Sequence, residues 1–128
     1  MSYYFSKILQ TTLEDAVSRV SDELKKEGFG VLTEIDVKET LKKKLNVDFR
    51  KYRILGACNP QYALKALEAE DKIGTMMPCN VIVQEIAGVG VEIAAIDPVA
   101  SLQAVKNPMV EEIARQVRDK LRDVIERL

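Results

Sequence analysis

Two strongly apolar runs, Cys79 to Ile86 and Val91 to Ile96, follow each other with only a short loop between them. The connecting residues, Ala87-Gly88-Val89-Gly90, form a glycine-containing loop of the kind that joins neighbouring antiparallel strands. Neither glycine belongs to a phosphate-binding loop, because no Lys, Ser or Thr follows and the chain continues into a strand instead of a helix. The sequence therefore predicts a β-sheet that contains this hairpin.

Three other segments have the alternating pattern and the β-branched or aromatic residues that are typical of strands. They run from Tyr3 to Leu9, from Val31 to Asp36 and from Tyr52 to Cys58. In the second segment, alternation predicts that Glu34 and Asp36 share one face, so that two carboxylates point the same way. The same alternation predicts that the other face of this segment carries Val31, Thr33 and Ile35.

Two long helices are predicted from apolar stripes at helical spacing. The first begins at Thr11 and Glu14, whose spacing is that of a capping box, and it ends at Gly28, which can adopt a left-handed conformation. The last begins at Asn107-Pro108 and keeps one apolar stripe through Leu128, while its other face is almost wholly charged. Each long helix should therefore cover a sheet with one side and meet water with the other.

Two shorter helices are predicted between strands. Asp36 and Glu39 also have the spacing of a capping box, and a short apolar stripe continues from them to Asn46. The role of helix cap explains Asp36 without any chemistry. Asn59 is a good cap and Pro60 a good first residue for the second short helix.

The order of the predicted elements is β-α-β-β-β-β-α with two short helices inserted, and no linker or internal repeat divides the chain. A chain of 128 residues in this order forms a single α+β domain, residues 1–128, in which one antiparallel sheet carries both long helices on one face. The other face of the sheet is then open and unusually apolar. A second copy of the chain, or a ligand, is the natural cover for such a face, so we expect a homodimer.

Composition excludes several classes of function. With 19 Lys and Arg against 20 Asp and Glu, the net charge is -1, so no overall field attracts the protein to nucleic acid or to an anionic membrane. No apolar run reaches the ~18 residues of a membrane-spanning helix, and residues 1–7 lack the pattern of a signal peptide. We therefore expect a cytoplasmic protein with reduced thiols. The chain has no histidine, which removes the commonest general base and the commonest zinc ligand.

The two cysteines mark the best place for a site. Cys58-Asn59-Pro60 ends one strand-like run, and Pro78-Cys79-Asn80 begins another. If these two strands are antiparallel, the end of one and the start of the other meet at the same edge of the sheet, and the two Cys-Asn pairs become neighbours. We interpret this region as a small polar pocket that binds a ligand.

Other interpretations stay open. Both cysteines could be small buried apolar residues, or they could form a thiol site in which Cys58 gains reactivity from the helix that follows it. A soft metal could bind them with help from Asp36, Asp97 or a second subunit, although two cysteines without histidine do not complete a zinc site within one chain. An anionic partner could bind the basic segment 42–53, which is otherwise a solvated face.

Four stretches resemble the domain-of-unknown-function 302 family: GFGVLTEID at 28–36, ILGACNP at 54–60, MPCNV at 77–81 and AIDP at 95–98. The resemblance covers essentially the whole chain. It implies a small α+β domain with the β-α-β4-α order, a topology like that of the TATA-box-binding protein, and a homodimer. It implies neither a reaction nor a cofactor, and the near-neutral charge argues against transferring nucleic-acid binding with the fold.

The motif residues that match the family and could form a site are polar or carry a thiol. They are Glu34, Asp36, Cys58, Asn59, Cys79, Asn80 and Asp97. The sequence thus predicts a homodimeric small-ligand-binding protein. Its alternatives are a thiol-based redox or metal-binding protein, and an interaction module that binds an anionic partner through Lys42 to Arg53.

Overall fold

The two apolar runs that predicted a hairpin form the middle of a five-stranded sheet. The computed structural model describes residues 2–128. Met1, which belongs to the segment 1–7 that lacks the pattern of a signal peptide, lies outside the described residues. The strands β4 (Cys79–Ile86) and β5 (Gly90–Ile96) pair antiparallel across a loop in which Gly88 has a φ of 74°. That conformation favours glycine, and the predicted hairpin is confirmed.

The whole sheet is antiparallel, with the strand order β1-β5-β4-β3-β2. The strand β3 (Tyr52–Cys58) lies on the other side of β4, and β1 (Tyr4–Leu9) and β2 (Gly30–Asp36) form the two edges. The strands β2, β3, β4 and β5 lie side by side in the order in which they occur in the chain. The strand β1 pairs with β5 and so joins the start of the chain to its later half. The predicted α+β architecture is confirmed.

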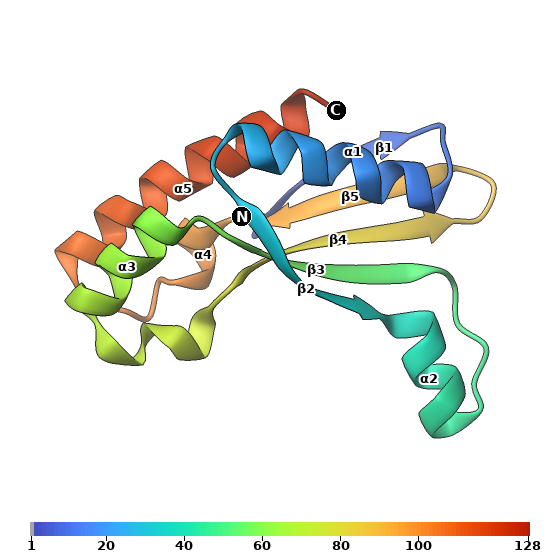
Figure 1. Cartoon of the computed structure of the whole chain (residues 1–128), viewed down its shortest axis with the longest axis horizontal. Helices are drawn as coiled ribbons and strands as arrows, with labels where there is room; N and C mark the ends of the chain where they lie inside the picture. The colour runs from blue at the N-terminus through green and yellow to red at the C-terminus, as the bar shows by residue number, and fades with distance from the viewer. Residues whose placement is uncertain (1) are drawn as a thin grey trace.

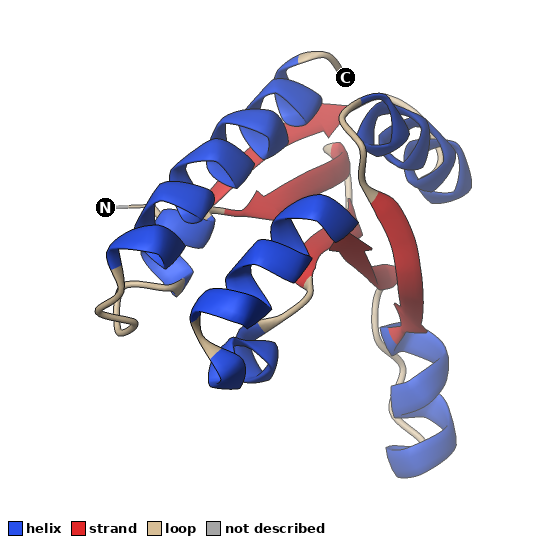
Figure 2. Cartoon of the chain, turned by 60° about the vertical axis from the view of Figure 1, so that its left-hand side comes forward, coloured by secondary structure: helices blue, strands red, loops and turns tan. Residues whose placement is uncertain are grey.

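Helices cover one face of this sheet. Figures 1 and 2 show α1 (Leu13–Lys26), α3 (Pro60–Ala69) and α5 (Pro108–Glu126) on the same side of it. The core lies between α1, α5 and the sheet, and within residues 2–128 no charged or polar residue is fully buried. The largest side chains that this core buries completely are Leu13, Leu24, Leu55, Ile93 and Leu121. The long helices therefore cover the sheet with their apolar stripes, as predicted.

Three shorter helical segments complete the chain. The helix α2 (Val37–Leu45) extends beyond the edge strand β2 and buries none of its residues (Figure 1). The 3-10 helix η1 (Asp71–Met76) and the four-residue α4 (Pro98–Ser101) lie near α3 and α5. Along residues 2–128, no helix is both long enough and apolar enough to cross a bilayer.

The observed helix caps confirm three predictions, at Asp36, Gly28 and Asn107, and correct two. Asp36 caps α2 by accepting a hydrogen bond from the Glu39 amide (3.0 Å), and Gly28 ends α1 with a φ of 88°. However, α1 is capped by Thr12, one residue after the predicted Thr11, because the Thr12 hydroxyl is the group that accepts the Asp15 amide (3.1 Å).

The second correction concerns Asn59, whose side chain does not cap α3. Its amide nitrogen instead donates to the carbonyl of Glu27 (3.1 Å), at the end of α1. The same nitrogen lies 3.1 Å from where a Cβ at Gly28 would stand, so the left-handed glycine also provides room for it. Asn59 therefore joins the end of α1 to the start of α3.

A β-bulge overturns the simple alternation predicted for β2. The register places Val31 opposite Ala57 but Thr33 opposite Gly56, so the intervening Leu32 is an extra residue and is 69% exposed. Residues directly opposite each other share a face, and adjacent residues of β3 point to opposite faces. Val31 therefore packs against the core, whereas Thr33 lies on the other face of the sheet.

The face of the sheet away from α1 and α5 is open. It carries Tyr4, Ile8 and Ile35, which are 41%, 46% and 48% exposed, and the half-buried Ile54 and Ile82. A hollow of about 310 Å³ lies on this face. It is lined by residues of β1, β3, β4 and β5 together with Tyr3, which precedes β1. The open apolar face that the element order predicted is therefore present in the chain.

Candidate functional site

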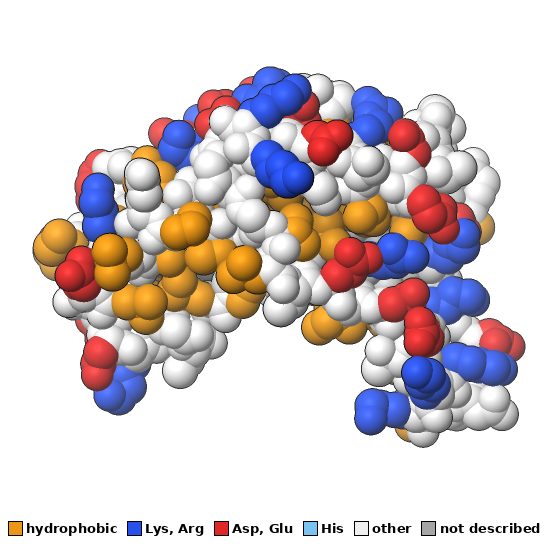
Figure 3. Space-filling view, viewed as in Figure 1, with side chains coloured by type: hydrophobic (Ala, Val, Ile, Leu, Met, Phe, Trp, Pro, Cys, Tyr) orange, Lys and Arg blue, Asp and Glu red, His pale blue; other side chains and the backbone are white. Residues whose placement is uncertain are grey.

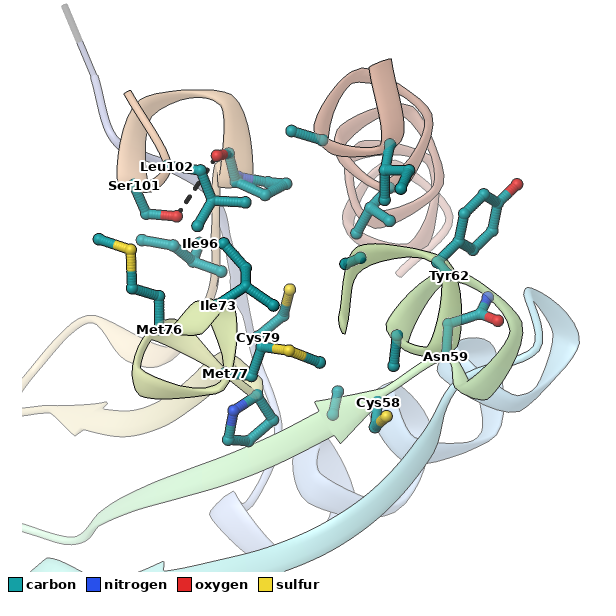
Figure 4. A pocket seen from close by; sticks show the side chains of 18 of the residues that line it. Cys58, Asn59, Tyr62, Ile73, Met76, Met77, Cys79, Ile96, Ser101 and Leu102 are labelled. Atoms are coloured by element: carbon teal, nitrogen blue, oxygen red, sulfur yellow. Dashed lines mark hydrogen bonds between the residues drawn. The ribbon is translucent and has the colours of Figure 1, made fainter. Parts of the chain in front are cut away.

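A cavity of about 340 Å³ lies between α3 and α5, above the edge of the sheet where β3 ends and β4 begins (Figure 4). Cys58, Asn59, Cys79 and Asn80 all line it. The register explains why they meet, because Ala57, the neighbour of Cys58, lies directly opposite Cys79 in the antiparallel pair. The sequence predicted that the two Cys-Asn pairs become neighbours if these strands are antiparallel. The strands are antiparallel, and both pairs line the same cavity.

The walls of the cavity are mainly apolar, whereas the sequence had suggested a polar pocket. None of the lining residues carries a charge. The helices α3, η1, α4 and α5, with the residues that directly follow η1 and α4, place these side chains around the space: Tyr62, Ile73, Met76, Met77, Leu102 and Ile113. Figure 3 shows the same contrast at the surface, where charged side chains cover α5 and α2 and apolar ones gather around α3 and η1.

The space exists because small residues face each other across it. Ala63 and Ala66 on α3 and Ala114 on α5 all line the cavity. An alanine on a buried helical stripe leaves room that a leucine would fill. The spacing of Ala63 and Ala66 on one helix is a signal in the sequence for a void, but Ala114 of α5, which lies across the cavity, is far along the chain.

Cys79 is the most strongly perturbed titratable group of the site. Burial, and secondarily the charge of the nearby Cys58, raises the pKa of the Cys79 thiol from 9.0 to about 11. An apolar surround disfavours the charged thiolate, so Cys79 is a neutral thiol at neutral pH. In Figure 4 its sulfur points into the cavity, and Cys58 lies at the end of β3. Both cysteines are free.

The polar groups of the cavity are few, and several are already held by the protein. Ser101 donates to the carbonyl of Pro98 (3.4 Å), and the Asn59 nitrogen is bound to Glu27 as described. Asn80 and Met76 are exposed and therefore lie at an opening of the cavity. A bound molecule would thus meet mainly apolar walls inside, together with the Cys79 thiol, and the amide side chain of Asn80 at the rim.

The other three predicted site residues lie elsewhere. Glu34 and Asp36 face Arg53, with oxygen-to-nitrogen distances of 2.8 and 3.8 Å, near the edge strand β2. Asp97 caps α4 by accepting a hydrogen bond from the Val99 amide (2.9 Å). None of the three lines the cavity, and each has a structural partner that accounts for it.

The basic segment 42–53 is largely paired with carboxylates. Lys42 lies 3.2 Å from Asp48, Lys43 lies 3.2 Å from Glu39, and Lys51 lies 3.2 Å from Glu14 across the fold. All these side chains are exposed, so the pairs contribute little to stability. They do reduce the positive field that the sequence run suggested.

No metal-binding cluster was found in the part of the chain that the structure describes: no three Cys, Asp or Glu side chains there come together in a way that could hold an ion. The two cysteines of the cavity are accompanied by methionines and amides instead.

Comparison with known proteins shows the family. The family model for the domain of unknown function DUF302 matches residues 5–128. A crystal structure of a conserved DUF302 protein from Bacillus stearothermophilus superimposes with a TM-score of 0.91 at 29% sequence identity, covering 99% of this chain and 98% of that one. No curated protein is similar enough to this chain to count as a match. The resemblance seen in the four sequence motifs is thus confirmed, and the chain belongs to the DUF302 family.

Proposed function

We propose that the protein is a homodimer that binds a compact, neutral and mainly apolar small molecule in the cavity between α3 and α5. The observation that carries this proposal is the cavity itself. Its volume of about 340 Å³ lies near the lower end of the ~300–1,000 Å³ that is typical of ligand pockets. Apolar walls with a few polar groups are also typical of such pockets.

The walls specify the chemistry of the ligand. Because no lining side chain is charged, an ionised group inside the cavity would lose its hydration without gaining a partner, which is costly. Met76 and Met77 are flexible and polarisable, so they can adapt to an irregular apolar body. A polar end of the ligand would meet the amide of Asn80 at the rim.

The exposed surface supports the homodimer. The chain exposes 7534 Å², whereas a monomeric protein of 14.4 kDa exposes about 6,800 Å² by the usual scaling. Part of this excess belongs to α2, which buries none of its residues, and part to the uncovered face of the sheet, where Tyr4, Ile8 and Ile35 are exposed. The open face of the sheet is the apolar surface that a second copy would cover.

The alternatives receive less support. Thiolate chemistry at Cys79 is disfavoured because burial raises the pKa of its thiol to about 11. Binding of an anionic partner, nucleic acid included, through segment 42–53 is disfavoured because Lys42, Lys43 and Lys51 already face carboxylates. We place the protein in the cytoplasm, whose reducing conditions would keep both cysteines free.

Titration with the neutral fluorescent probe N-phenyl-1-naphthylamine tests the cavity. In the variant Ala63→Phe a large side chain enters the cavity, so we expect the affinity for the probe to fall at least tenfold. Leu64→Phe is the matched control, because Leu64 is 60% exposed on the same helix and the change should leave binding as it is. Equal affinities of the two variants would overturn the cavity as the site. If only Ala63→Phe weakens binding of the probe, native mass spectrometry of protein purified from its own host identifies the natural ligand that the cavity retains.

A further inference from the structure

A line of polar contacts with opposite charges at its ends crosses the open face of the sheet. The Arg50 Nε donates to the Gln84 Oε1 (2.8 Å), and the Gln84 Nε2 donates to the Glu92 Oε1 (2.8 Å). Arg50 precedes β3, Gln84 lies on the central strand β4, and Glu92 lies on β5. The amide of Gln84 is therefore fixed between a cation on one side and a carboxylate on the other.

The cationic end of the line is held in place. The Arg50 guanidinium carbon lies 4.4 Å from the centre of the Phe49 ring and 5.5 Å from that of the Tyr52 ring. Contacts of this kind attract a guanidinium to the faces of aromatic rings. Arg50 is nevertheless exposed, so its remaining donors are free to bind an acceptor from outside the chain.

Neither end of the line has an ionic partner within residues 2–128. Lys42, Lys43, Lys51 and Arg53 of the basic segment 42–53 form ion pairs. Arg50 of that segment and Glu92 form none within residues 2–128. Glu92 is half-buried and lines the hollow of the open face beside Gln84 and Ile82. Covering this face with any partner would remove water from Glu92, and a carboxylate that loses its water without gaining a cation is unfavourable.

We propose that this line sets the register of the homodimer: the twofold axis passes beside Gln84, so that Arg50 of each copy pairs with Glu92 of the partner subunit. This inference rests on the proposed homodimer. In a twofold interface the same patch meets itself in reverse. A patch with a cation at one end and a carboxylate at the other is complementary to its own reverse, and it forms two equivalent ion pairs. The register thus supplies both missing partners at once.

Charge reversal with heterodimer rescue tests this register. In Arg50→Glu, both symmetric contacts become Glu against Glu, and in Glu92→Arg both become Arg against Arg. We expect each single variant to raise the dimer dissociation constant at least tenfold, because like charges that face each other in an interface repel. In an equimolar mixture of the two variants, every contact again joins opposite charges. Native mass spectrometry should therefore show a heterodimer fraction well above the one half that random pairing of the two variants would give.

Matched controls separate register from total charge. Arg115→Glu and Glu112→Arg produce the same changes in net charge on exposed residues of α5 and should leave the dimer unchanged. Circular dichroism and thermal unfolding check that every variant is folded.

Three outcomes would overturn one proposal or the other. A wild-type protein that is monomeric at micromolar concentration refutes the homodimer itself. A dimeric wild type whose Arg50 and Glu92 variants remain dimeric refutes the register and leaves the homodimer standing. Monomeric single variants that fail to form heterodimers on mixing also refute the register.

Discussion

The thiol of Cys79 gives the most quantitative prediction. Burial and the charge of Cys58 raise the pKa of this thiol from 9.0 to about 11. Only the thiolate reacts with an alkylating reagent. At about pH 8, a thiol with a pKa of 9.0 is about one-tenth ionised, and one with a pKa of about 11 is about one-thousandth ionised. We therefore expect Cys79 to react about a hundredfold more slowly in the folded protein than in urea.

Alkylation with iodoacetamide, followed by peptide mass spectrometry over a range of pH, measures this difference. The rate for folded Cys79 should keep rising about tenfold per pH unit well beyond 9.0, and Cys58 should be the faster thiol throughout. The variant Cys58→Ala removes the smaller cause of the shift. In that variant the apparent pKa of Cys79 should fall, yet stay above 9.0, because burial is the larger cause.

Two results would refute the reasoning. One is a folded Cys79 that reacts within about tenfold of its rate in urea, and the other is an apparent pKa near 9.0. The same shift affects stability. Because the folded protein favours the protonated thiol, this contribution of about 2–3 kcal/mol is complete below pH 9 and is lost as pH rises through about 11. A Cys79→Ala variant should lack this alkaline loss.

Three further predictions concern stability and can be checked by urea unfolding. Gly56→Ala should lower the free energy of unfolding by about 1–3 kcal/mol, because a Cβ there would overlap Thr33. In the control Gly30→Ala the new Cβ meets no atom within 4 Å, so this loss should be absent. Equal losses in the two variants would contradict the packing argument. Asp36→Ala should cost about 1 kcal/mol through the lost cap, and an unchanged midpoint would show that the cap contributes nothing. Leu121→Ala should cost about 2–5 kcal/mol, because the side chain is fully buried, and a loss below 1 kcal/mol would contradict its place in the core.

Hydrophobic periodicity was sufficient to predict the fold. The stripes of α1 and α5 and the alternation of the strands are local properties of the chain, and they decide which side of each element is buried. The prediction was wrong where a tertiary contact decides the local structure. Leu32 interrupts the alternation of β2 as a bulge, and Asn59 bonds to Glu27 instead of capping its own helix.

The candidate site was predictable in position but not in character. Antiparallel pairing of β3 and β4 brings Cys58 and Cys79 together, and the sequence contained the motifs for it. The apolar walls come partly from Ile113 and Ala114 of α5, which follow the cysteines by several elements. Which side chains face each other across a void depends on how the helices pack, and a pattern within one helix does not specify that packing.

Asn80 and Ile96 line both the cavity beside the helices and the hollow on the opposite face of the sheet. A molecule that shifts either side chain from within the cavity would therefore alter the surface offered to a second copy. Coupling of this kind is reciprocal, so association of two copies would change the affinity for the ligand by the same factor. The concentration of the protein itself would then set how tightly each chain holds its ligand.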